Sequence, residues 1–486
     1  MPNIDFSIEL HCHPTFKPLG KSYKLKVGVQ SANNNEETSL WHYDAPSVFE
    51  KLLNYVGGLT KFSQANFTAA AYGTVWVITV SMGSIEKWFF NNKLGTGTIS
   101  NILGEFATEV SVPRINAIQD MQDYFKDLSQ EYEFLREMND QKIQIEGAWY
   151  TYRIVNNFTE LQNVITTNEL TINLQQDNPI VVAIIPSIEG MHVLNCGLGK
   201  PCSNEEVIAN ARALKASPNK PWFITFTHHF YNELCGHSLS LQGLVAKECD
   251  QSTGIDTGFT ELGKEVLDIL LDNVNGKRIL IDIKHLSPIG RKQFFKIHEE
   301  KYPDIPIIIS HGACNGLPNM DQTISDSPEL GNTFYGGGIN FYDEEIVKVV
   351  NSNGIFGLQL DERRIANRET FKNIKRSIFR NKIMYYRSQL LWNQVQYIAE
   401  LLDKNDLPAW SNIAIGSDYD GLVDPLNSFW TMAQYPILKS YLERHAYNYM
   451  KNSSRRLKNG FNKIDADVIV QNIFHTNAWE FLKTWF

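Results

Sequence analysis

Several histidine and carboxylate side chains stand directly after short apolar stretches of this sequence. The six with the clearest pattern are His11, His13, Glu189, His285, His311 and Asp418. Imidazole nitrogens and carboxylate oxygens are the ligands by which proteins hold zinc and similar divalent ions. Each of these residues alone is more typical of a hydrogen-bonded core position or a turn. Their joint placement after separate apolar stretches predicts a metal site.

The first two histidines have the spacing of a metal clamp. His11 and His13 are two residues apart, so in an extended strand their side chains point to the same face. An HxH pattern also arises by chance at surfaces and core edges. Its significance here comes from the four other residues, which are expected to converge on it.

Such a set of side chains supports a two-metal hydrolytic site. Two histidines near one wall and two near the other would hold two divalent ions, expected to be Zn²⁺, bridged by the Glu189 carboxylate. Paired ions about 3.5–4 Å apart lower the pKa of a bridging water and polarise a substrate carbonyl. Asp418 is predicted to ligate one ion, take the proton from the attacking water and pass it to the leaving amine.

Other polar residues near these stretches have more than one interpretation. Asp420 either binds substrate or caps a turn, and His228 either donates to the substrate carbonyl oxygen or has a structural role. Weaker candidates are His192, His229 and His237. Lys284 precedes His285 in a predicted strand, so we expect its side chain to face away from the barrel interior. The sequence contains no GxSxG motif, which disfavours a serine nucleophile.

Eight short apolar runs, rich in β-branched residues and separated by helical stretches, precede or contain these groups. They are Phe6–Leu10, Thr74–Val80, Ile180–Ile185, Trp222–Phe226, Ile279–Ile283, Ile305–Ile309, Ile355–Leu360 and Ile413–Ile415. Continuous apolar runs are typical of parallel strands that are covered on both faces. We therefore predict an α/β fold with a (β/α)8 TIM-like barrel, and a doubly wound open sheet is the competing layout. In a barrel, the C-terminal strand ends form one rim where distant residues meet.

Two long insertions interrupt the regular alternation of strands and helices. They span about 14–59, after the first strand, and about 84–175, after the second. Within the second, residues 112–136 look helical and residues 142–155 alternate like a hairpin. Segments that follow barrel strands lie at the active-site mouth, so we interpret both insertions as rim or lid material. We predict a single domain over residues 1–486.

The composition limits the classes of partner. A net charge of −9 and a pI near 5.8 disfavour nucleic-acid binding, because a nucleic-acid binder needs a basic surface to replace counterions at the phosphates. No apolar run approaches the ~20 residues that span a bilayer, and the N-terminus lacks a signal-peptide pattern. Six cysteines without a CxxC pair indicate reduced thiols. We therefore expect a cytoplasmic protein with a small-molecule substrate and neither a nucleic-acid nor a membrane partner.

Six segments of the sequence resemble the membrane (renal-type) dipeptidase family of the amidohydrolase superfamily. They are SIEGMH at 187–192, TFTH at 225–228, GFTELG at 258–263, IDIKHLS at 281–287, PIIISH at 306–311 and GSDYDG at 416–421. The resemblance runs from residue 11 nearly to the C-terminus, with the two insertions between. It implies a (β/α)8 barrel, a binuclear zinc-type site, hydrolysis of a dipeptide or related amide, and a homodimer as the form often found in the family.

Carried over to this sequence, the resemblance assigns roles to the residues singled out above. It makes His11 and Glu189 metal ligands with Glu189 as the bridge, and His285 and His311 the ligands of the second ion. It makes Asp418 the catalytic carboxylate and His228 the histidine that polarises the substrate.

Two positions depart from the family pattern. The family has HxD where this chain has His11 and His13, so the first ion gains a neutral ligand and loses a negative one. The family also places an arginine shortly after the sixth-strand histidine, suited to a substrate carboxylate, where this chain has Asn315. We hypothesise that Arg363 and Arg364, just beyond the seventh strand, supply that charge instead.

The leading prediction is a metal-dependent hydrolase that cleaves an amide or peptide bond of a small, dipeptide-like substrate. An enzyme of the same superfamily acting on an ester, lactone or cyclic amide is the alternative, favoured by Asn315 and the large insertions. A barrel that binds a ligand without catalysis is the third interpretation. It predicts a missing ligand, whereas all six expected positions carry metal-competent side chains.

Overall fold

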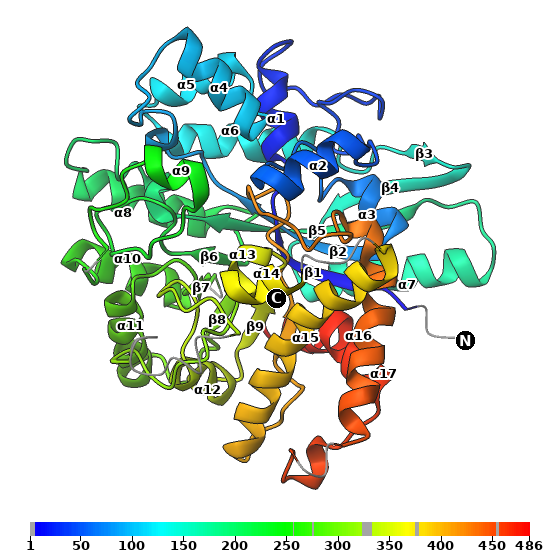
Figure 1. Ribbon diagram of the computed structural model, residues 1–486. Coiled ribbons are helices and arrows are strands. Elements are labelled where there is room, and N and C mark those ends of the chain that lie inside the picture. The colour runs from blue at the N-terminus through cyan, green and yellow to red at the C-terminus, as the bar shows by residue number, and fades with distance from the viewer. Residues whose placement is uncertain (1–4, 256, 275–276, 323–332, 375–378, 453–455) are drawn as a thin grey trace.

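The computed structural model describes residues 5–255, 257–274, 277–322, 333–374, 379–452 and 456–486 (Figure 1). Eight strands form a parallel path in the order β1-β2-β5-β6-β7-β8-β9-β10. Their bounds are β1 (Ser7–Cys12), β2 (Val75–Met82), β5 (Ile180–Glu189), β6 (Phe223–Thr225), β7 (Leu280–Asp282), β8 (Ile308–Gly312), β9 (Ile355–Leu358) and β10 (Ile413–Ile415). Each overlaps one of the eight predicted apolar runs.

The path closes on itself just beyond β10. Cys12 pairs in parallel with Tyr419, the His13 amide donates to the Tyr419 carbonyl at 2.9 Å, and the Asp418 amide donates to the His11 carbonyl at 2.9 Å. The predicted (β/α)8 barrel is therefore confirmed, and the open doubly wound sheet is excluded. All residues of β1 and β2 are buried, as expected for strands with no solvent-facing side.

Helices follow the barrel strands in turn. They are α8 (Asn204–Ala216) after β5, α10 (Glu261–Leu271) after β6, α11 (Pro288–Lys301) after β7, α12 (Asp343–Asn351) after β8, α15 (Arg380–Lys404) after β9 and α16 (Tyr435–Met450) after β10. Shorter helices are α9 (Gly243–Glu248), α13 (Glu362–Ile365), α14 (Arg368–Ile374), α17 (Ala466–Gln471) and α18 (Asn477–Trp485). Side-chain caps from Ser203, Thr260 and Ser287 begin α8, α10 and α11 and satisfy free amide groups of the first turn.

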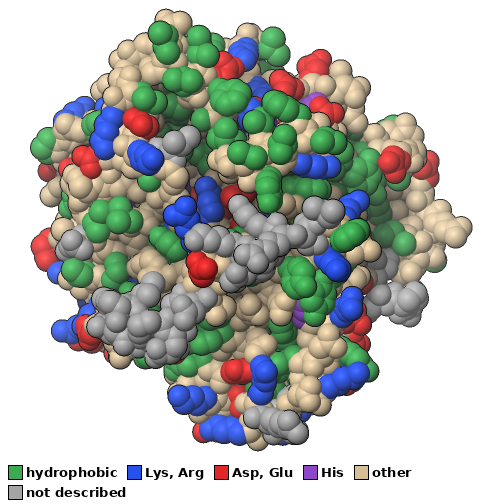
Figure 2. Space-filling view, in the orientation of Figure 1, with side chains coloured by type: hydrophobic (Ala, Val, Ile, Leu, Met, Phe, Trp, Pro, Cys, Tyr) green, Lys and Arg blue, Asp and Glu red, His purple; other side chains and the backbone are tan. Residues whose placement is uncertain are grey.

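The insertions carry the remaining elements. The first holds α1 (Phe16–Ser22) and α2 (Val48–Gly57), and α3 (Phe67–Tyr72) precedes β2. The second holds α4 (Thr98–Thr108), α5 (Val112–Gln119), α6 (Tyr124–Glu137), β3 (Ile143–Ile145), β4 (Ala148–Ile154) and α7 (Phe158–Asn173). In Figure 1, α1, α2, α4 and α5 lie together on one side of the barrel. Figure 2 shows apolar side chains gathered over α2 and α4, where Val48 and Ile99 are 84% and 78% exposed.

Two details of the second insertion differ from the sequence prediction. The helical stretch 112–136 is broken into α5 and α6, because the Asp123 side chain caps a new helix by accepting from the Lys126 amide. The predicted hairpin exists as β3 and β4, but β4 pairs with Ile180–Ile184 of β5. That is the N-terminal half of β5, whereas β6 pairs with Ile188 and Glu189 at its C-terminal end. The hairpin therefore extends the sheet away from the mouth of the barrel.

Candidate metal centre and its pocket

A pocket opens at the C-terminal ends of the barrel strands and encloses about 120 Å³ of water-accessible space. We call it the central pocket. Its lining includes His13, Glu189, His228, His285, His311 and Asp418, together with Phe16 of the first insertion and Phe89, Phe90 and Thr108 of the second. Parts of both insertions thus lie at the mouth, as the strand order predicts.

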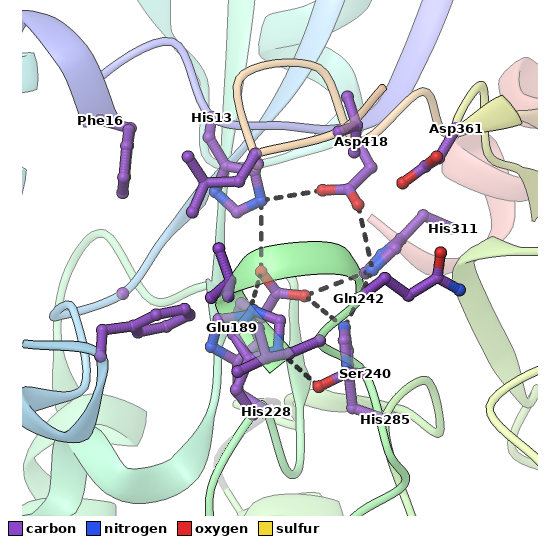
Figure 3. Close-up of a pocket in the computed structure, with 18 of the residues that line it drawn as sticks. His13, Phe16, Glu189, His228, Ser240, Gln242, His285, His311, Asp361 and Asp418 are labelled. Atoms are coloured by element: carbon purple, nitrogen blue, oxygen red, sulfur yellow. Dashed lines mark hydrogen bonds and ion pairs between the residues drawn. The ribbon is translucent and has the colours of Figure 1, made fainter. Parts of the chain in front are cut away.

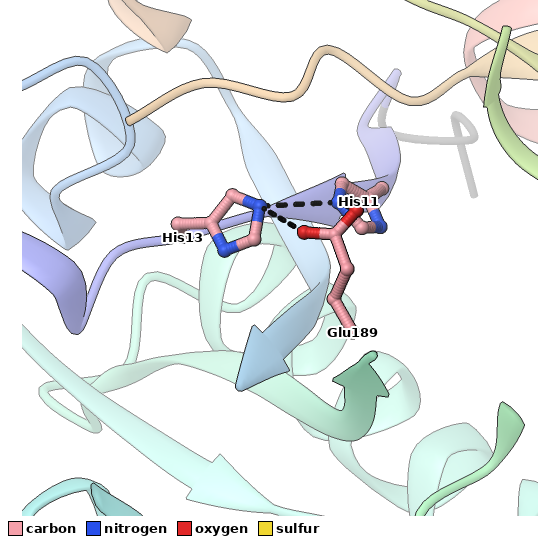
Figure 4. A group of neighbouring side chains, drawn as sticks. All are labelled: His11, His13 and Glu189. Atoms are coloured by element: carbon pink, nitrogen blue, oxygen red, sulfur yellow. Dashed lines mark hydrogen bonds and ion pairs between the residues drawn. The ribbon is translucent and has the colours of Figure 1, made fainter. Parts of the chain in front are cut away.

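The first wall of the site is formed by β1 and β5. The Nε2 atoms of His11 and His13 lie 3.1 Å apart, which shows that the two rings share one face of the strand. The Glu189 carboxylate stands between them, with Oε1 3.6 Å from His11 Nε2 and Oε2 3.2 Å from His13 Nε2. Figure 4 shows the two rings and the carboxylate turned toward one another.

The second wall comes from the ends of β7 and β8. His285 and His311 bring their Nε2 atoms to 3.2 Å of each other, and these atoms lie 3.3 and 3.4 Å from Glu189 Oε1. Asp418 closes the ring of ligands, with Oδ1 3.4 Å from His13 Nε2 and Oδ2 4.0 Å from His311 Nε2. The structure therefore brings all six predicted metal-site residues together. Figure 3 shows five of them, and Figure 4 shows His11 beside His13 and Glu189.

The arrangement fits a cation better than it fits hydrogen bonding among the side chains. Five histidine Nε2 atoms, including that of His228, lie within 3.6 Å of the Glu189 carboxylate, and Glu189 Oε1 is buried without a hydrogen-bond partner among the described residues. Burial raises the pKa of Glu189, but the rings of His228 and His11 outweigh it and hold that pKa well below its usual value. Burial lowers the pKa of His285 to about 3, which keeps the ring neutral with a lone pair for a metal.

The ring of His311 is oriented by a chain of hydrogen bonds behind it. Asp282 Oδ2 accepts from the Ser310 hydroxyl at 2.6 Å and from the Thr225 hydroxyl at 2.6 Å. Because the Ser310 proton goes to Asp282, its oxygen is left to accept from His311 Nδ1 at 2.8 Å. The proton therefore sits on Nδ1, and Nε2 faces the cluster as an acceptor.

Two of the candidate ligands have an unusual backbone. His285 and Asp418 adopt positive φ angles of 67° and 61°, a region that costs energy for residues other than glycine. In both cases the strand has just ended, at Asp282 in β7 and at Ile415 in β10. The left-handed turn directs each side chain into the pocket.

His228 also lines the pocket, and its partner is a residue that the sequence analysis did not single out. Its Nδ1 lies 3.0 Å from Glu86 Oε2, and its Nε2 lies 3.4 Å from Glu189 Oε2. Burial lowers the pKa of His228, but the charges of Glu189 and Glu86 outweigh it and raise that pKa. The sequence feature that could have identified Glu86 is its position, four residues after the end of β2.

The expectation for Lys284 is wrong. Its side chain lines the central pocket and is 1% exposed, instead of facing away from the barrel interior. The prediction assumed strand alternation through His285, but β7 ends at Asp282 and His285 has a left-handed backbone. Alternation therefore does not apply beyond Asp282. Burial lowers the pKa of Lys284 to about 7.

The structure also places the residues with open interpretations. Asp420 is 2% exposed and accepts from the Gln64 and Ala65 amides at 2.9 and 2.8 Å. Of its two interpretations, substrate binding and capping, these bonds favour the structural one. His237 is fully buried and bonded to backbone carbonyls, and His192 lies 2.7 Å from the Ser84 carbonyl. By contrast, His229 lines the pocket, with Nδ1 2.6 Å from the Ser240 hydroxyl.

The three residues discussed for a substrate carboxylate differ in position. Asn315 is fully buried, and its side-chain oxygen accepts from the Leu317 amide at 2.9 Å. It lies outside the described lining of the central pocket, whereas Arg363 and Arg364 are part of it. Arg363 is engaged by Asp361, with Nη2 2.7 Å from Oδ2.

Comparison with known proteins supports the architecture. No protein-family model and no curated protein matches the chain. Among solved structures, a metallopeptidase from Rhodobacter sphaeroides, liganded with a phosphinate mimic of the dipeptide L-Ala-D-Ala, is similar with a TM-score of 0.50, 11% identity and 100% coverage of both chains. The probable dipeptidase PvdM from Pseudomonas aeruginosa has a TM-score of 0.49, 11% identity, and 97% and 99% coverage.

The similarity to the Rhodobacter protein and the motif resemblance to the dipeptidase family agree on a (β/α)8 barrel. The likeness covers the full length of both chains. Among the described helices, none is both long enough and apolar enough to cross a bilayer.

Proposed function

We propose that this protein is a metal-dependent hydrolase that cleaves the amide bond of a dipeptide or a related small amide. The observation that supports it is the convergence of the Nε2 atoms of four candidate histidine ligands on the buried carboxylate of Glu189, with Asp418 beside three of these rings. The Rhodobacter metallopeptidase of similar fold is liganded with a dipeptide mimic, which makes dipeptides the first substrates to test.

The donor set would divide between two ions. His11, His13 and Glu189 form one group of potential ligands, and Glu189, His285 and His311 form another, so Glu189 would be shared by both ions. Asp418 joins His11 and His311 in a third group. Nitrogen and oxygen donors in this number are suited to Zn²⁺ or a similar borderline ion.

In the reaction, bound divalent ions supply a water of lowered pKa and polarise the scissile carbonyl. The protein then contributes a base and a hydrogen-bond donor. Asp418 takes the proton of the attacking water and returns it to the leaving amine. His228, held through Nδ1 by Glu86, directs Nε2 toward the carbonyl oxygen and stabilises its developing charge. The aromatic rings of Phe16, Phe89 and Phe90 at the mouth exclude water from the bound substrate.

The first experiment is elemental analysis of protein purified without chelators. We expect about two equivalents of zinc or a similar ion per chain, reduced in His285→Ala. The Asp418→Asn variant should lose activity with a smaller loss of metal, because an amide oxygen can still ligate but cannot accept the proton. His42→Ala is the matched control, since His42 contacts Asn34 and Asp44 outside the pocket. Absence of metal in the parent protein, even after reconstitution, would overturn the proposal.

A substrate panel separates the amide hydrolase from the superfamily alternatives. Dipeptides, cyclic amides, lactones and simple esters are compared by kcat/KM on the metal-loaded protein. Preference for a lactone or ester would keep the metal centre and replace the substrate class. Full metal occupancy with no turnover of any substrate would favour a binding barrel. A cytoplasmic location and a homodimer remain part of the proposal, and light scattering tests the dimer.

A further inference from the structure

Three side chains that line the central pocket have a nitrogen donor without a partner among the described residues. The donors are Nζ of Lys284, Nε2 of Gln359 and Nη1 of Arg364, and the structure gives none of them a hydrogen bond to any described residue. The three side chains are only 1%, 2% and 7% exposed. Buried donors are nearly always paired, so three unpaired donors around one pocket indicate a ligand that they are shaped to receive.

The donors belong to the strand ends on either side of His311. Lys284 follows β7 and Gln359 follows β9, and both strands pair with β8, which carries His311. Arg364 lies on α13, the helix that begins directly after β9. The donors therefore lie beside the second wall of the metal centre.

The guanidinium of Arg364 is fixed in place, with one nitrogen left over. Its Nη2 donates to the Ser240 carbonyl, and its plane lies over the ring of Tyr335 at 5.6 Å. The neighbouring Arg363 differs, because its Nε and Nη2 are both bonded to Asp361 and its Nη2 also donates to the Leu422 carbonyl at 3.0 Å. Of the two arginines, Arg364 is thus the one for which a guanidinium nitrogen, Nη1, has no partner among the described residues.

The nearby carboxylates are already engaged by other groups. Asp361 pairs with Arg363, and Asp282 accepts from Thr225 and Ser310. Glu189 and Asp418 belong to the metal centre. Lys284 and Arg364 are therefore two buried basic side chains whose free donors face no hydrogen-bonded counter-ion among the described residues, and a ligand with negative charge would supply one.

We propose that Lys284, Gln359 and Arg364 form an anion subsite that binds a carboxylate of the substrate beside the metal centre. The inference rests on the proposed hydrolase function and specifies its substrate class as an amide that carries a free carboxylate. Two cations and one amide donor around a carboxylate give charge-assisted hydrogen bonds, which are stronger than neutral ones. Asn315 also has an unpaired buried nitrogen, but it lies outside the described lining of the central pocket and is not part of this subsite.

The carboxylate can come from the C-terminus of a dipeptide or from an acidic side chain. Three substrates distinguish these sources on the metal-loaded enzyme: L-Ala-D-Ala, its C-terminal amide, and L-Ala-D-isoglutamine, which has an amidated C-terminus and a free side-chain carboxylate. The subsite predicts that kcat/KM exceeds that of the alanyl amide by about 10- to 100-fold for the substrate whose carboxylate it binds. Equal values for all three substrates would overturn the inference while leaving the hydrolase intact.

Two variants then connect the preference to these residues. Lys284→Met keeps the length of the side chain and should remove most of the preference for the acid over the alanyl amide, mainly through the KM of the acid. Gln359→Glu is isosteric, introduces a like charge and should reverse the preference. Lys296→Met, at an exposed position of α11, is the control and should match wild type. Metal content is measured in each variant, because a merely structural role would change metal content or the hydrolysis of both substrates alike.

The two levels of the proposal fail in different ways. If no amide is hydrolysed, the hydrolase is refuted, and the subsite is judged by calorimetric binding of the same three compounds to the metal-loaded protein. The subsite is supported if the wild-type protein binds an acid at least 10-fold more tightly than the amide and Lys284→Met loses this difference in affinity. Binding that ignores both the carboxylate and Lys284 would refute it.

Discussion

Replacing Glu86 by glutamine removes the charge that orients His228 and preserves the shape of the side chain. The carboxylate is 2% exposed and lies 3.0 Å from His228 Nδ1. It also accepts from the amides of His229 and Phe230 at 3.2 and 2.9 Å. A glutamine offers only one acceptor oxygen, so at least one of these donors would face an NH2 group. A buried hydrogen bond to a charged group is worth about 1.5–3 kcal/mol, and we expect the free energy of unfolding to fall by about 2 kcal/mol.

The same change acts on catalysis through the orientation of His228. Without a carboxylate at Nδ1 the ring can turn, and its Nε2 no longer points steadily into the pocket. Loss of a partner that orients an active-site histidine typically costs about 10- to 100-fold, and we expect this loss in kcat with KM nearly unchanged. Metal content should stay at the wild-type level, because Glu86 is not among the potential ligands.

The pH dependence of stability provides an independent check. Burial raises the pKa of Glu86, but His228 and His192 outweigh it and lower that pKa below the ordinary 4.5. A folded-state pKa below the unfolded-state value means that the contribution is complete above pH 4.5 and disappears as pH falls through the folded-state pKa. Glu86→Gln should therefore lose stability at neutral pH and show a shallower decline in acid.

The assays are urea unfolding between pH 3 and pH 7 and steady-state kinetics on the metal-loaded protein. Glu261→Gln is the control, since this side chain is 90% exposed and pairs only with Lys264 at the surface. It should change stability by less than about 0.5 kcal/mol. Wild-type kcat in metal-loaded Glu86→Gln would refute the role assigned to the Glu86–His228 pair.

Three further outcomes follow from the packing and the site. In Gly416→Ala the new Cβ would lie 1.8 Å from the Ser310 carbonyl oxygen, so urea unfolding should show a loss of about 3 kcal/mol. Arg291→Met leaves the fully buried Glu345 without the guanidinium that contacts it at 2.5 Å, and should lower the free energy of unfolding by about 3–5 kcal/mol. Lys483→Met, at an exposed position, is the control and should leave the free energy of unfolding unchanged. Chelation should lower both Tm and activity, and added Zn²⁺ should restore both; a Tm indifferent to metal would contradict the site.

The barrel was predictable because its strands are covered on both faces. Such strands must be continuous apolar runs, and all eight runs found in the sequence overlap barrel strands. The pairing of β4 with the N-terminal half of β5 was not predictable, because it depends on where a hairpin packs and not on its own pattern. The break between α5 and α6 was marked by Asp123, an N-cap residue inside a stretch that otherwise looks continuous.

The convergence of the six candidate ligands was predictable because parallel strand ends meet at one rim, whatever their separation in sequence. Residues placed by turns were harder to find. Lys284 was misplaced because strand alternation was extended past the end of β7, and the left-handed backbone of His285 is invisible in the sequence. Glu86 lies beyond the end of β2, where no histidine or motif draws attention to it. Its importance appears only through its contact with His228.

The charge balance of the pocket links the two unusual features of this chain. Where the family pattern has an aspartate, His13 is neutral as a ligand, so Glu189 and Asp418 are the ionised ligands among the six. Two divalent ions bound there as proposed would leave the centre with a net charge of plus two, one more than with an aspartate at position 13. Arg364 adds positive charge in the lining of the same pocket. A site so charged attracts anionic substrates and strengthens the polarisation of a bound carbonyl. It follows that His13→Asp should weaken the discrimination between acid and amide substrates, even though His13 does not touch the substrate carboxylate. If the ratio of kcat/KM for acid over amide stays unchanged in this variant, anion recognition is confined to the subsite itself.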